Sequence, residues 1–339
     1  MNLRQQIRTV LVTGATGFVG GAVAQRLRSE NCIVRTLVRR NSDTATLTAA
    51  GCELCFGDIT EAASVQEAMA GADAAVHCAA LASDWDPPER FVQVNIEGSR
   101  HIFEAALQCG VKRIVHISTT DVLGVYPDGR TVDDSYPLKK TGFPYSDTKA
   151  EAERIAFAYA KERGLPVAVI RPAWIFGPGD RHFLPEIVEA MRAHQMMFIG
   201  SSRNTIPMCY IDNLVDAILL ALTCPEAVGQ AYIVCDGAVM SWRELTDLLA
   251  DQLGLSKVRW TVPLPVAQVL AFGAETLAKL EKSTKRPALT RYWLAFGSRD
   301  LHYSNSKICR ELSFSPQIMP EEGLARSIEW LKSDKFTRK

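Results

Sequence analysis

The sequence lacks an excess of charge of either sign. Its 339 residues include 38 lysines and arginines against 38 aspartates and glutamates. A chain balanced in this way has no strong electrostatic field with which to attract nucleic acid or an anionic membrane nonspecifically. The expected ligand is therefore a small molecule, and no nucleic-acid partner is expected.

The N-terminal region lacks the apolar segment of a secretory signal, because its first apolar run, Val10 to Val12, passes directly into a glycine turn. The apolar stretch 262–280 contains two prolines, a glutamate and a lysine. A membrane-spanning helix needs about 20 mainly apolar residues. A core or lid helix is expected there, with weak contact to a membrane surface as the alternative.

The sequence also lacks a pattern of paired cysteines. Its nine cysteines are an odd number and are spread along the chain. Cys52 and Cys55 have metal or redox spacing, but no second CxxC motif follows them. We therefore expect free thiols, no metal site and a reducing, cytoplasmic setting.

Apolar β-branched runs alternate with segments of helical periodicity over the first half of the chain. The predicted strands are 7–13, 32–39, 52–57, 73–78, 112–118 and 167–171, and the predicted helices include 61–70, 88–109 and 145–163. This alternation predicts an α/β protein with a Rossmann doubly wound parallel sheet.

Proline and glycine clusters after residue 172 mark a boundary. Helices are predicted at 183–194, 211–222, 241–253, 265–281 and 321–332, with a late strand at 231–235. The expected organisation is a dinucleotide-binding Rossmann domain at 1–172 with a returning segment near 205–236. A smaller, mostly helical substrate domain is expected at 173–204 and 237–332, followed by a tail at 333–339.

The segment TGATGFVG places Gly14, Gly17 and Gly20 where the first strand turns into a helix. Gly14 permits the tight turn, Gly17 lets the backbone approach a pyrophosphate, and Gly20 allows the helix to lie close to the strand. This context predicts dinucleotide binding. Thr16, Phe18 and Val19, which lie between the glycines, complete the predicted contact set of this loop.

The end of the second strand determines which nicotinamide dinucleotide is preferred. An acidic residue there would bind a ribose 2′-hydroxyl, whereas this chain has Arg39 and Arg40. A guanidinium can hold a 2′-phosphate through paired hydrogen bonds. NADP is therefore the predicted cofactor. NAD stays the alternative, since the two arginines could equally be solvated side chains at a strand end.

Other predicted cofactor contacts follow the later strands. Asp58 and Ile59 come after the third strand, where Asp58 would meet the adenine edge, and Ala79 and Ala80 after the fourth strand leave room for the cofactor. Asn95 is also predicted to contact the cofactor.

Tyr145 and Lys149 lie four residues apart at the start of a predicted helix, and so on one face of it. A tyrosine with a pKa near 10 is a poor base at neutral pH, and a nearby ammonium can lower that pKa. The strand 112–118 ends in Ser118, Thr119 and Thr120, and one of these hydroxyls could hold a substrate oxygen against Tyr145.

Taken together, these motifs resemble those of the extended short-chain dehydrogenase/reductases over nearly the whole chain. The family pattern TGxxGxxG, a strand-edge serine or threonine, YxxxK and RPxxxxGPGD matches here, the last at Arg171 to Asp180. The spacing back from Gly124 in that family would place the catalytic hydroxyl on Thr119, with Ser118 as its neighbour. The resemblance further implies that Pro172 lines the nicotinamide and that the protein is a homodimer.

Within this family the chain is most similar to the 3β-hydroxysteroid dehydrogenase branch, which includes reductases of long-chain β-keto acids. The segments GPGDRHFLP at 177–185, YIDNLVDA at 210–217 and PALTRYWL at 287–294 carry this likeness. The steroid enzymes usually have an acidic residue where this chain has Arg39, which puts NAD in doubt.

The substrate site is predicted from the loop after the fourth strand and from the start of the second domain. Its candidate residues are Asp84, Trp85, Thr120, Ile175, His182 and Phe183. An apolar lining is expected from Phe183, Leu184, Ile187, Met191, Met196, Met197 and Phe198, and such methionine-rich surfaces suit bulky apolar ligands. The alternative is that these side chains only pack the small domain.

These observations favour an oxidoreductase that transfers hydride between NADP(H) and a secondary alcohol or ketone of an apolar substrate, such as a sterol or a long-chain β-keto acid. Two alternatives stay open: a nucleotide-sugar epimerase or dehydratase that uses a bound cofactor transiently, and a cofactor-binding sensor.

Overall fold

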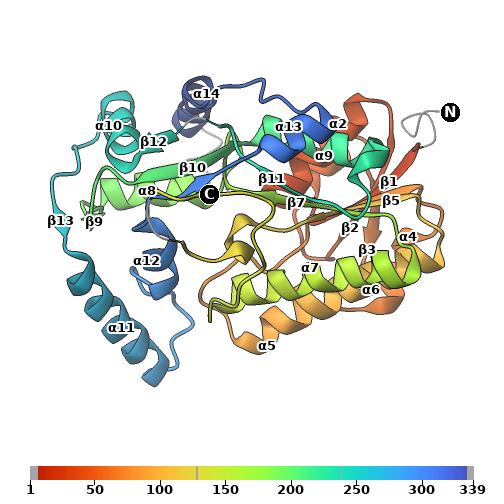
Figure 1. Cartoon of the computed structure of the whole chain (residues 1–339), viewed down its shortest axis with the longest axis horizontal. Helices are drawn as coiled ribbons and strands as arrows, with labels where there is room; N and C mark the ends of the chain where they lie inside the picture. The colour runs from red at the N-terminus through yellow and green to blue at the C-terminus, as the bar shows by residue number, and fades with distance from the viewer. Residues whose placement is uncertain (1–6, 127–128, 238, 334–339) are drawn as a thin grey trace.

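The computed structural model describes residues 7–126, 129–237 and 239–333, which are arranged around one large parallel sheet (Figure 1). Its seven strands run in the order β11-β7-β5-β4-β1-β2-β3. Their bounds are Ala231–Val234, Val167–Pro172, Arg113–Ile117, Ala74–His77, Thr9–Thr13, Ile33–Val38 and Glu53–Phe56. The strand order reverses between β1 and β4, the position at which open α/β sheets bind ligands. The predicted Rossmann fold is therefore confirmed.

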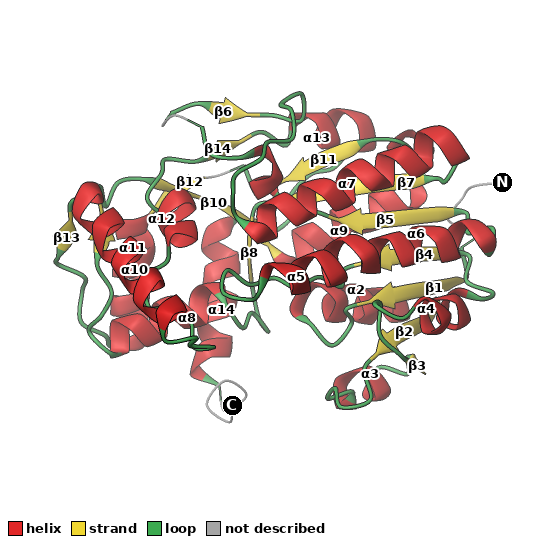
Figure 2. Cartoon of the chain, turned by 90° about the horizontal axis from the view of Figure 1, so that it is seen from below, coloured by secondary structure: helices red, strands yellow, loops and turns green. Residues whose placement is uncertain are grey.

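Helices cover both faces of this sheet (Figure 2). On one face lie α2 (Phe18–Ser29) and α9 (Ile211–Thr223), and on the other lie α4 (Ala62–Met69), α6 (Gly98–Gln108) and α7 (Pro144–Arg163). The alternating side chains of β1 explain this arrangement, because Val10 and Val12 pack into one buried cluster and Leu11 into the other. A strand buried on both faces reads as a continuous apolar run in the sequence.

The helix predicted over 88–109 is divided in the structure. It consists of α5 (Pro88–Phe91), a π-helical turn, η1 (Val92–Glu97), and α6. The Asn95 side chain in the π-helical turn is buried and bonds outside its own helix. Such turns disturb the regular spacing that periodicity detects. A short helix that periodicity did not predict, α3 (Ala45–Ala49), lies between β2 and β3.

Several of the elements after β7 gather at the carboxyl end of the large sheet. A three-stranded sheet contains β8 (Trp174–Phe176), β10 (Thr205–Tyr210) and β12 (Val239–Ser241), and a short pair joins β9 (Phe198–Ile199) to β13 (Thr261–Val262). Around them lie α8 (Phe183–Arg192), α10 (Trp242–Leu253), α11 (Leu264–Leu280), α12 (Arg291–Gly297) and α14 (Pro320–Lys332). The remaining elements are β6 (Thr131–Val132), which pairs with β14 (His302–Tyr303), the 3-10 turns η2 (Thr120–Leu123) and η3 (Pro225–Ala227), and α13 (Ser306–Leu312).

The segment 205–236 was predicted to return to the first domain. Within it, α9 packs on β5 and β7, and β11 pairs with β7 at the edge of the large sheet. In contrast, β10 pairs with β8 and β12 in the smaller sheet. The predicted tail 333–339 lies outside the described residues apart from Ser333.

Helix α11 lies at the end of the molecule remote from α4 (Figure 1). It buries a narrow stripe of Ala267, Ala271 and Glu275, where the Glu275 carboxylate binds the Arg291 guanidinium. Its outer side chains Val266, Val269, Leu270, Phe272, Leu277 and Leu280 are exposed. Among the described helices, none has the length and apolar character that a bilayer crossing requires. Contact with a membrane surface through 262–280 stays a prediction.

A buried ion pair connects α7 to β7. The Arg171 guanidinium donates from Nε to both carboxylate oxygens of Glu153, at 3.1 and 3.2 Å, and also from a terminal nitrogen. The Glu153 side chain is fully buried and that of Arg171 is 6% exposed. Removing one partner from such a pair would leave an uncompensated charge in the core.

We therefore predict that Arg171→Met lowers the free energy of unfolding by about 3 to 5 kcal/mol, measured by urea denaturation. The matched control is Arg154→Met on the same helix, which breaks a surface pair with Glu151 at 3.0 Å. That control should cost less than about 1 kcal/mol, because exposed pairs are screened by solvent. Equal losses for the two variants would contradict the assigned role of the buried pair.

Candidate active site

The glycine turn between β1 and α2 has the close packing that its sequence predicted. Gly14 has a φ of +68°, and a Cβ atom there would lie 2.7 Å from the Ala79 backbone nitrogen. A Cβ atom on Gly20 would collide with the Gly14 carbonyl oxygen. Only glycine fits these two positions, so the turn brings the start of α2 against the ends of β1 and β4.

The first turn of α2 offers free hydrogen-bond donors. The helix begins after Gly17 with no side-chain cap, and no acidic residue occupies its first turn. The backbone N–H groups of Phe18, Val19 and Gly20 therefore have no partner inside the helix. Donors of this kind at the positive end of a helix bind phosphate groups, so the residues present fit a dinucleotide pyrophosphate.

The end of β2 places Arg39 and Arg40 in exposed positions. The Arg40 guanidinium lies 6.0 Å from the centre of the Phe56 ring, and Arg39 makes no ion pair within the described part of the chain. After β3, Asp58 accepts hydrogen bonds from the backbone and the hydroxyl of Thr60, both at 2.9 Å. These contacts fix the turn that carries Asp58 and the buried Ile59. That Arg39, Arg40, Asp58 and Ile59 contact the adenosine part of the cofactor stays a prediction.

Asn95 links the loop after β4 to α7. Its side-chain oxygen accepts from the Leu81 backbone N–H at 2.7 Å, and its amide donates to the Thr148 hydroxyl at 3.1 Å. Asn95 is 1% exposed. The amide is thus committed to the protein itself, and it holds the loop of Ala79 and Ala80 beside the residue that precedes Lys149.

Tyr145, Lys149 and Thr119 meet at the carboxyl end of β5. Lys149 is buried, and its ammonium donates to the Ile117 carbonyl oxygen at 2.6 Å. Burial lowers the pKa of Lys149 to about 8, against the opposing effect of Glu153 and Cys78. The Thr119 hydroxyl forms a hydrogen bond with Tyr145, which lowers the pKa of the phenol. The three predicted catalytic residues are therefore close together.

The structure identifies which strand-end hydroxyl faces Tyr145. The Ser118 hydroxyl instead donates to the Glu153 carboxylate at 2.8 Å and is buried. Ser118 is therefore committed to the buried ion pair, which leaves Thr119 as the hydroxyl that can hold a substrate oxygen. Thr120 is 1% exposed and therefore buried. Neighbouring side chains along an extended segment point to opposite sides. Three adjacent hydroxyl residues in a sequence do not show which of them faces Tyr145.

The pKa of Tyr145 does not fall below its ordinary value, although the sequence led us to expect that it would. The structure raises that pKa, because burial and the negative charge of Asp121 outweigh the hydrogen bond from Thr119. The Lys149 ammonium is directed at the Ile117 carbonyl. In the chain by itself Tyr145 is therefore protonated at neutral pH.

Sequence reasoning missed two polar residues beside Tyr145. The Tyr292 hydroxyl on α12 donates to the Asp121 carboxylate at 2.5 Å, and Asp121 is 5% exposed. The Tyr145 and Tyr292 rings meet edge to face, with centroids 6.3 Å apart. The sequence contained a signal for both, since Asp121 directly follows Thr119 and Thr120, and Tyr292 lies in the segment 287–294. Their separation by 171 positions concealed the contact.

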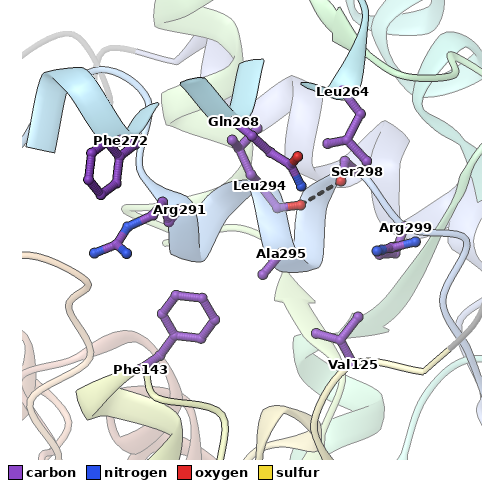
Figure 3. Close-up of a pocket in the computed structure, with 10 residues that line it drawn as sticks. All are labelled: Val125, Phe143, Leu264, Gln268, Phe272, Arg291, Leu294, Ala295, Ser298 and Arg299. Carbon is purple, nitrogen blue, oxygen red and sulfur yellow. Dashed lines mark hydrogen bonds between the residues drawn. The ribbon is translucent and has the colours of Figure 1, made fainter. Parts of the chain in front are cut away.

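A pocket of about 450 Å³ lies next to this cluster, between α11 and α12 on one side and Phe143 and Val125 on the other (Figure 3). Its lining residues are Val125, Phe143, Leu264, Gln268, Phe272, Arg291, Leu294, Ala295, Ser298 and Arg299. Phe143 comes two residues before Tyr145 and contacts Tyr292, with ring centroids 5.5 Å apart. The pocket is therefore mainly apolar, and its wall at Phe143 contacts Tyr292 beside Tyr145.

The apolar lining predicted along 183–198 is largely wrong. Leu184, Ile187, Met191 and Phe198 are buried in the core, and Phe183 packs edge to face on Trp174 at 5.3 Å. These side chains form one face of the amphipathic helix α8 and of β9, and that face covers the small sheet. The pocket takes its apolar walls from α11 and α12 instead.

The other predicted substrate residues are dispersed. Asp84 binds the Arg286 guanidinium at 2.6 Å and the Thr290 hydroxyl at 2.5 Å, and Trp85 donates to the Ser283 carbonyl at 3.3 Å. They fasten the loop after β4 to the segment between α11 and α12. The His182 side chain is 77% exposed beside Glu186, while Ile175 lies in β8 and Pro172 is buried at the end of β7.

Among the described residues, no group of three histidine, cysteine or acidic side chains is arranged to hold a metal ion. His77 is an example of a histidine used in the core. Its ring bonds the hydroxyls of Thr13 at 2.8 Å and Ser99 at 3.0 Å, and burial lowers its pKa to about 3.

Comparison with known proteins matches residues 10–235 to the NAD dependent epimerase/dehydratase family. A ketoreductase from Stigmatella aurantiaca, named for 4-hydroxy-2-methyl-3-oxo-4-farnesyl-3,4-dihydroquinoline-1-oxide, is 30% identical over 92% of this chain and 93% of its own length. A 2-alkyl-3-oxoalkanoate reductase from Stenotrophomonas maltophilia is 30% identical over 94% and 97%. The crystal structure of a double mutant of the dTDP-glucose 4,6-dehydratase DesIV from Streptomyces venezuelae, with NAD and DAU bound, has a TM-score of 0.79 and 26% identity, over 97% of this chain and 98% of that one.

Proposed function

Because this chain belongs to the NAD dependent epimerase/dehydratase family, we propose that it interconverts a ketone and a secondary alcohol on an apolar substrate, using NADP(H). It is an NAD(P)-dependent oxidoreductase of the extended short-chain dehydrogenase/reductase superfamily. The proposed substrate class is a sterol or a long-chain β-keto acid. The observation that carries the proposal is the apolar pocket beside Phe143, two residues from Tyr145.

When bound, the dinucleotide supplies or accepts the hydride. In the proposed reduction, Thr119 and Tyr145 hold the substrate oxygen by hydrogen bonds, and the Tyr145 hydroxyl gives its proton to that oxygen. Lys149 provides a buried positive charge and steadies the end of β5 through the Ile117 carbonyl, and it would bind the cofactor. In the oxidation the same proton returns to Tyr145.

The glycine turn and the start of α2 would hold the pyrophosphate, with Thr16 in the same loop. Arg39 and Arg40 would receive the adenosine 2′-phosphate, because both guanidinium groups lie on the exposed end of β2. The relatives' names support a ketone substrate of apolar character, since one acts on a farnesylated quinoline and another on 2-alkyl-3-oxoalkanoates.

The nucleotide-sugar alternative is favoured by the full-length structural likeness to a dTDP-glucose 4,6-dehydratase and by 30% identity to a UDP-glucose 4-epimerase from Vibrio cholerae. A sugar-diphosphate site needs several converging cations. The pocket offers Arg291, whose charge is balanced by Glu275 at 2.7 Å, and Arg299. This balance favours an apolar ligand over a diphosphate.

We predict that Tyr145→Phe lowers kcat of ketone reduction by at least about 100-fold while cofactor affinity changes little, because only the transferable proton is lost. Steady-state kinetics and a cofactor fluorescence titration would measure the two effects. The matched control is Tyr136→Phe, at a residue that packs against Tyr126 away from the site. A Tyr145→Phe enzyme that kept more than a tenth of its kcat would contradict the proton-donor role.

For the cofactor, we predict that NADP(H) binds more tightly than NAD(H) and that Arg39→Asp reverses this order. The substitution removes a charge-assisted contact worth about 1.5 to 3 kcal/mol and adds an anion that repels the 2′-phosphate. Fluorescence titration with both dinucleotides measures the preference. Arg8→Asp, at an exposed position before β1, is the control for the change in net charge. Equal wild-type affinities for the two dinucleotides would support the solvated-arginine interpretation.

The substrate class is tested by assaying a hydroxysteroid, a long-chain β-hydroxy acid and several UDP-sugars side by side. We predict turnover of an apolar substrate, and we predict that Ala295→Phe raises its KM at least about fivefold by filling the pocket. Ala274→Phe on the exposed side of α11 is the matched control, because Ala274 does not line the pocket. Turnover confined to the UDP-sugars would overturn the proposal in favour of the epimerase reaction.

A further inference from the structure

We propose that Asp121, held in place by Tyr292, is a positioning residue that keeps the Tyr145 hydroxyl protonated, and so extends ketone reduction to a higher pH. This inference rests on the proposed function, because it concerns the proton that Tyr145 gives to the substrate. It assigns roles to two residues outside the serine or threonine, tyrosine and lysine set. Neither side chain takes part in the predicted chemistry.

The geometry brings Asp121 to the catalytic hydroxyls through Thr119. The Asp121 backbone N–H donates to the Thr119 hydroxyl oxygen at 3.2 Å, and Thr119 is also hydrogen-bonded to Tyr145. Asp121 opens the η2 turn directly after β5, so its position is fixed by the end of the sheet. The Asp121 backbone is therefore tied to the Thr119 hydroxyl that lies beside the Tyr145 phenol.

Tyr292 secures this carboxylate from the opposite side. Its hydroxyl donates to Asp121 at 2.5 Å, and its ring packs edge to face on both Tyr145 and Phe143, at 6.3 and 5.5 Å between centroids. Because Phe143 also lines the apolar pocket, Tyr292 connects the pocket wall to the Asp121 carboxylate. The arrangement exists only where α12 packs against the start of α7.

No cation neutralises Asp121 within the described residues. Its charge bears on three phenols, those of Tyr145, Tyr292 and Tyr303, which come from α7, α12 and β14. A buried carboxylate opposes ionisation of any phenol near it, since two negative charges repel strongly where water is excluded. Phenolate formation at Tyr145 is therefore disfavoured.

The other charged groups around Tyr145 are already occupied. The Lys149 ammonium donates to the Ile117 carbonyl, and Asp84, which faces Tyr292, is balanced by Arg286 at 2.6 Å. The pKa of Asp121 itself is raised by burial to about 6, against hydrogen bonds from Tyr292 and Thr119. Above about pH 6 the carboxylate is ionised, so its charge acts on Tyr145 at neutral pH and is lost in more acidic solution.

The charge of Asp121 shifts the pH ranges in which the enzyme runs ketone reduction and alcohol oxidation. It does not change the overall equilibrium between ketone and alcohol. Reduction uses Tyr145 with its proton, and each turnover leaves a phenolate that must recover a proton from solvent. A nearby negative charge favours this recovery. Oxidation uses the phenolate, which forms only at a higher pH while Asp121 is charged.

The test is the pH dependence of kcat/KM for alcohol oxidation in Asp121→Asn, which removes the charge and keeps the shape. The Tyr145 limb is the part of this curve in which kcat/KM rises with pH as Tyr145 ionises. It should move to lower pH by about one unit or more, because the opposing charge is gone. The control is Asp212→Asn at an exposed carboxylate in the first turn of α9, which should leave the limb in place. A lower rate at every pH without movement of the limb would mean a merely structural role and would overturn the proposal.

Tyr292→Phe provides a second variant if Asp121→Asn fails to fold. Losing the hydroxyl removes a hydrogen bond that partly offsets the negative charge of Asp121. Asp121 stays ionised at the alkaline pH at which Tyr145 titrates, so the Tyr145 limb should move to higher pH, opposite to its movement in Asp121→Asn. No movement in this folded variant would contradict the assigned link between Tyr292 and Asp121.

A readout without substrate separates this inference from the proposed function. Phenolate absorbance is titrated with NADP⁺ bound, and the difference between the enzyme and its Tyr145→Phe variant isolates Tyr145. The same difference in the Asp121→Asn background should titrate at lower pH. If no ketone is turned over but this shift is found, the proposed function fails and the assigned charge effect stands. An identical titration in both backgrounds overturns the inference.

Discussion

The ion pair between Glu153 and Arg171 fixes the helix face on which the site is built. Glu153 follows Lys149 by four residues, and Lys149 follows Tyr145 by four, so the three side chains share one side of α7. By binding a guanidinium on β7, Glu153 determines how α7 is rotated about its axis. The same carboxylate accepts the Ser118 hydroxyl, which turns Ser118 away and leaves Thr119 facing Tyr145. A contact inside the core thus selects the hydroxyl that faces the phenol.

Two buried charges lie on either side of this assembly. Lys149 is positive and directed at the end of β5, whereas Asp121 is negative and held by Tyr292. Each is shielded from water, so each influences the phenol more strongly than a surface charge would. In the chain itself, burial and the charge of Asp121 favour the protonated form of Tyr145.

The segment after α11 brings the substrate side of the molecule to this centre. Arg286 and Thr290 bind Asp84 from the loop after β4, and Tyr292 binds Asp121 after β5. These contacts close α12 over the carboxyl ends of two neighbouring strands of the large sheet. The apolar pocket forms in the space that α11, α12 and Phe143 leave between them (Figure 3).

The sequence by itself determined the local features of this protein. Alternating β-branched runs, the spaced glycines and the YxxxK motif are contiguous, and their geometry follows from strand and helix periods, so the Rossmann sheet, its glycine turn and the pairing of Tyr145 with Lys149 were all predictable. Only the tertiary structure decided which of Ser118, Thr119 and Thr120 faces Tyr145, because that depends on the rotation of α7 against β7. The Asp121 and Tyr292 contact joins positions 171 residues apart, and the pocket is lined from α11 and α12 rather than from α8. Such pairings depend on how separate elements pack, and no local pattern in the chain records that packing.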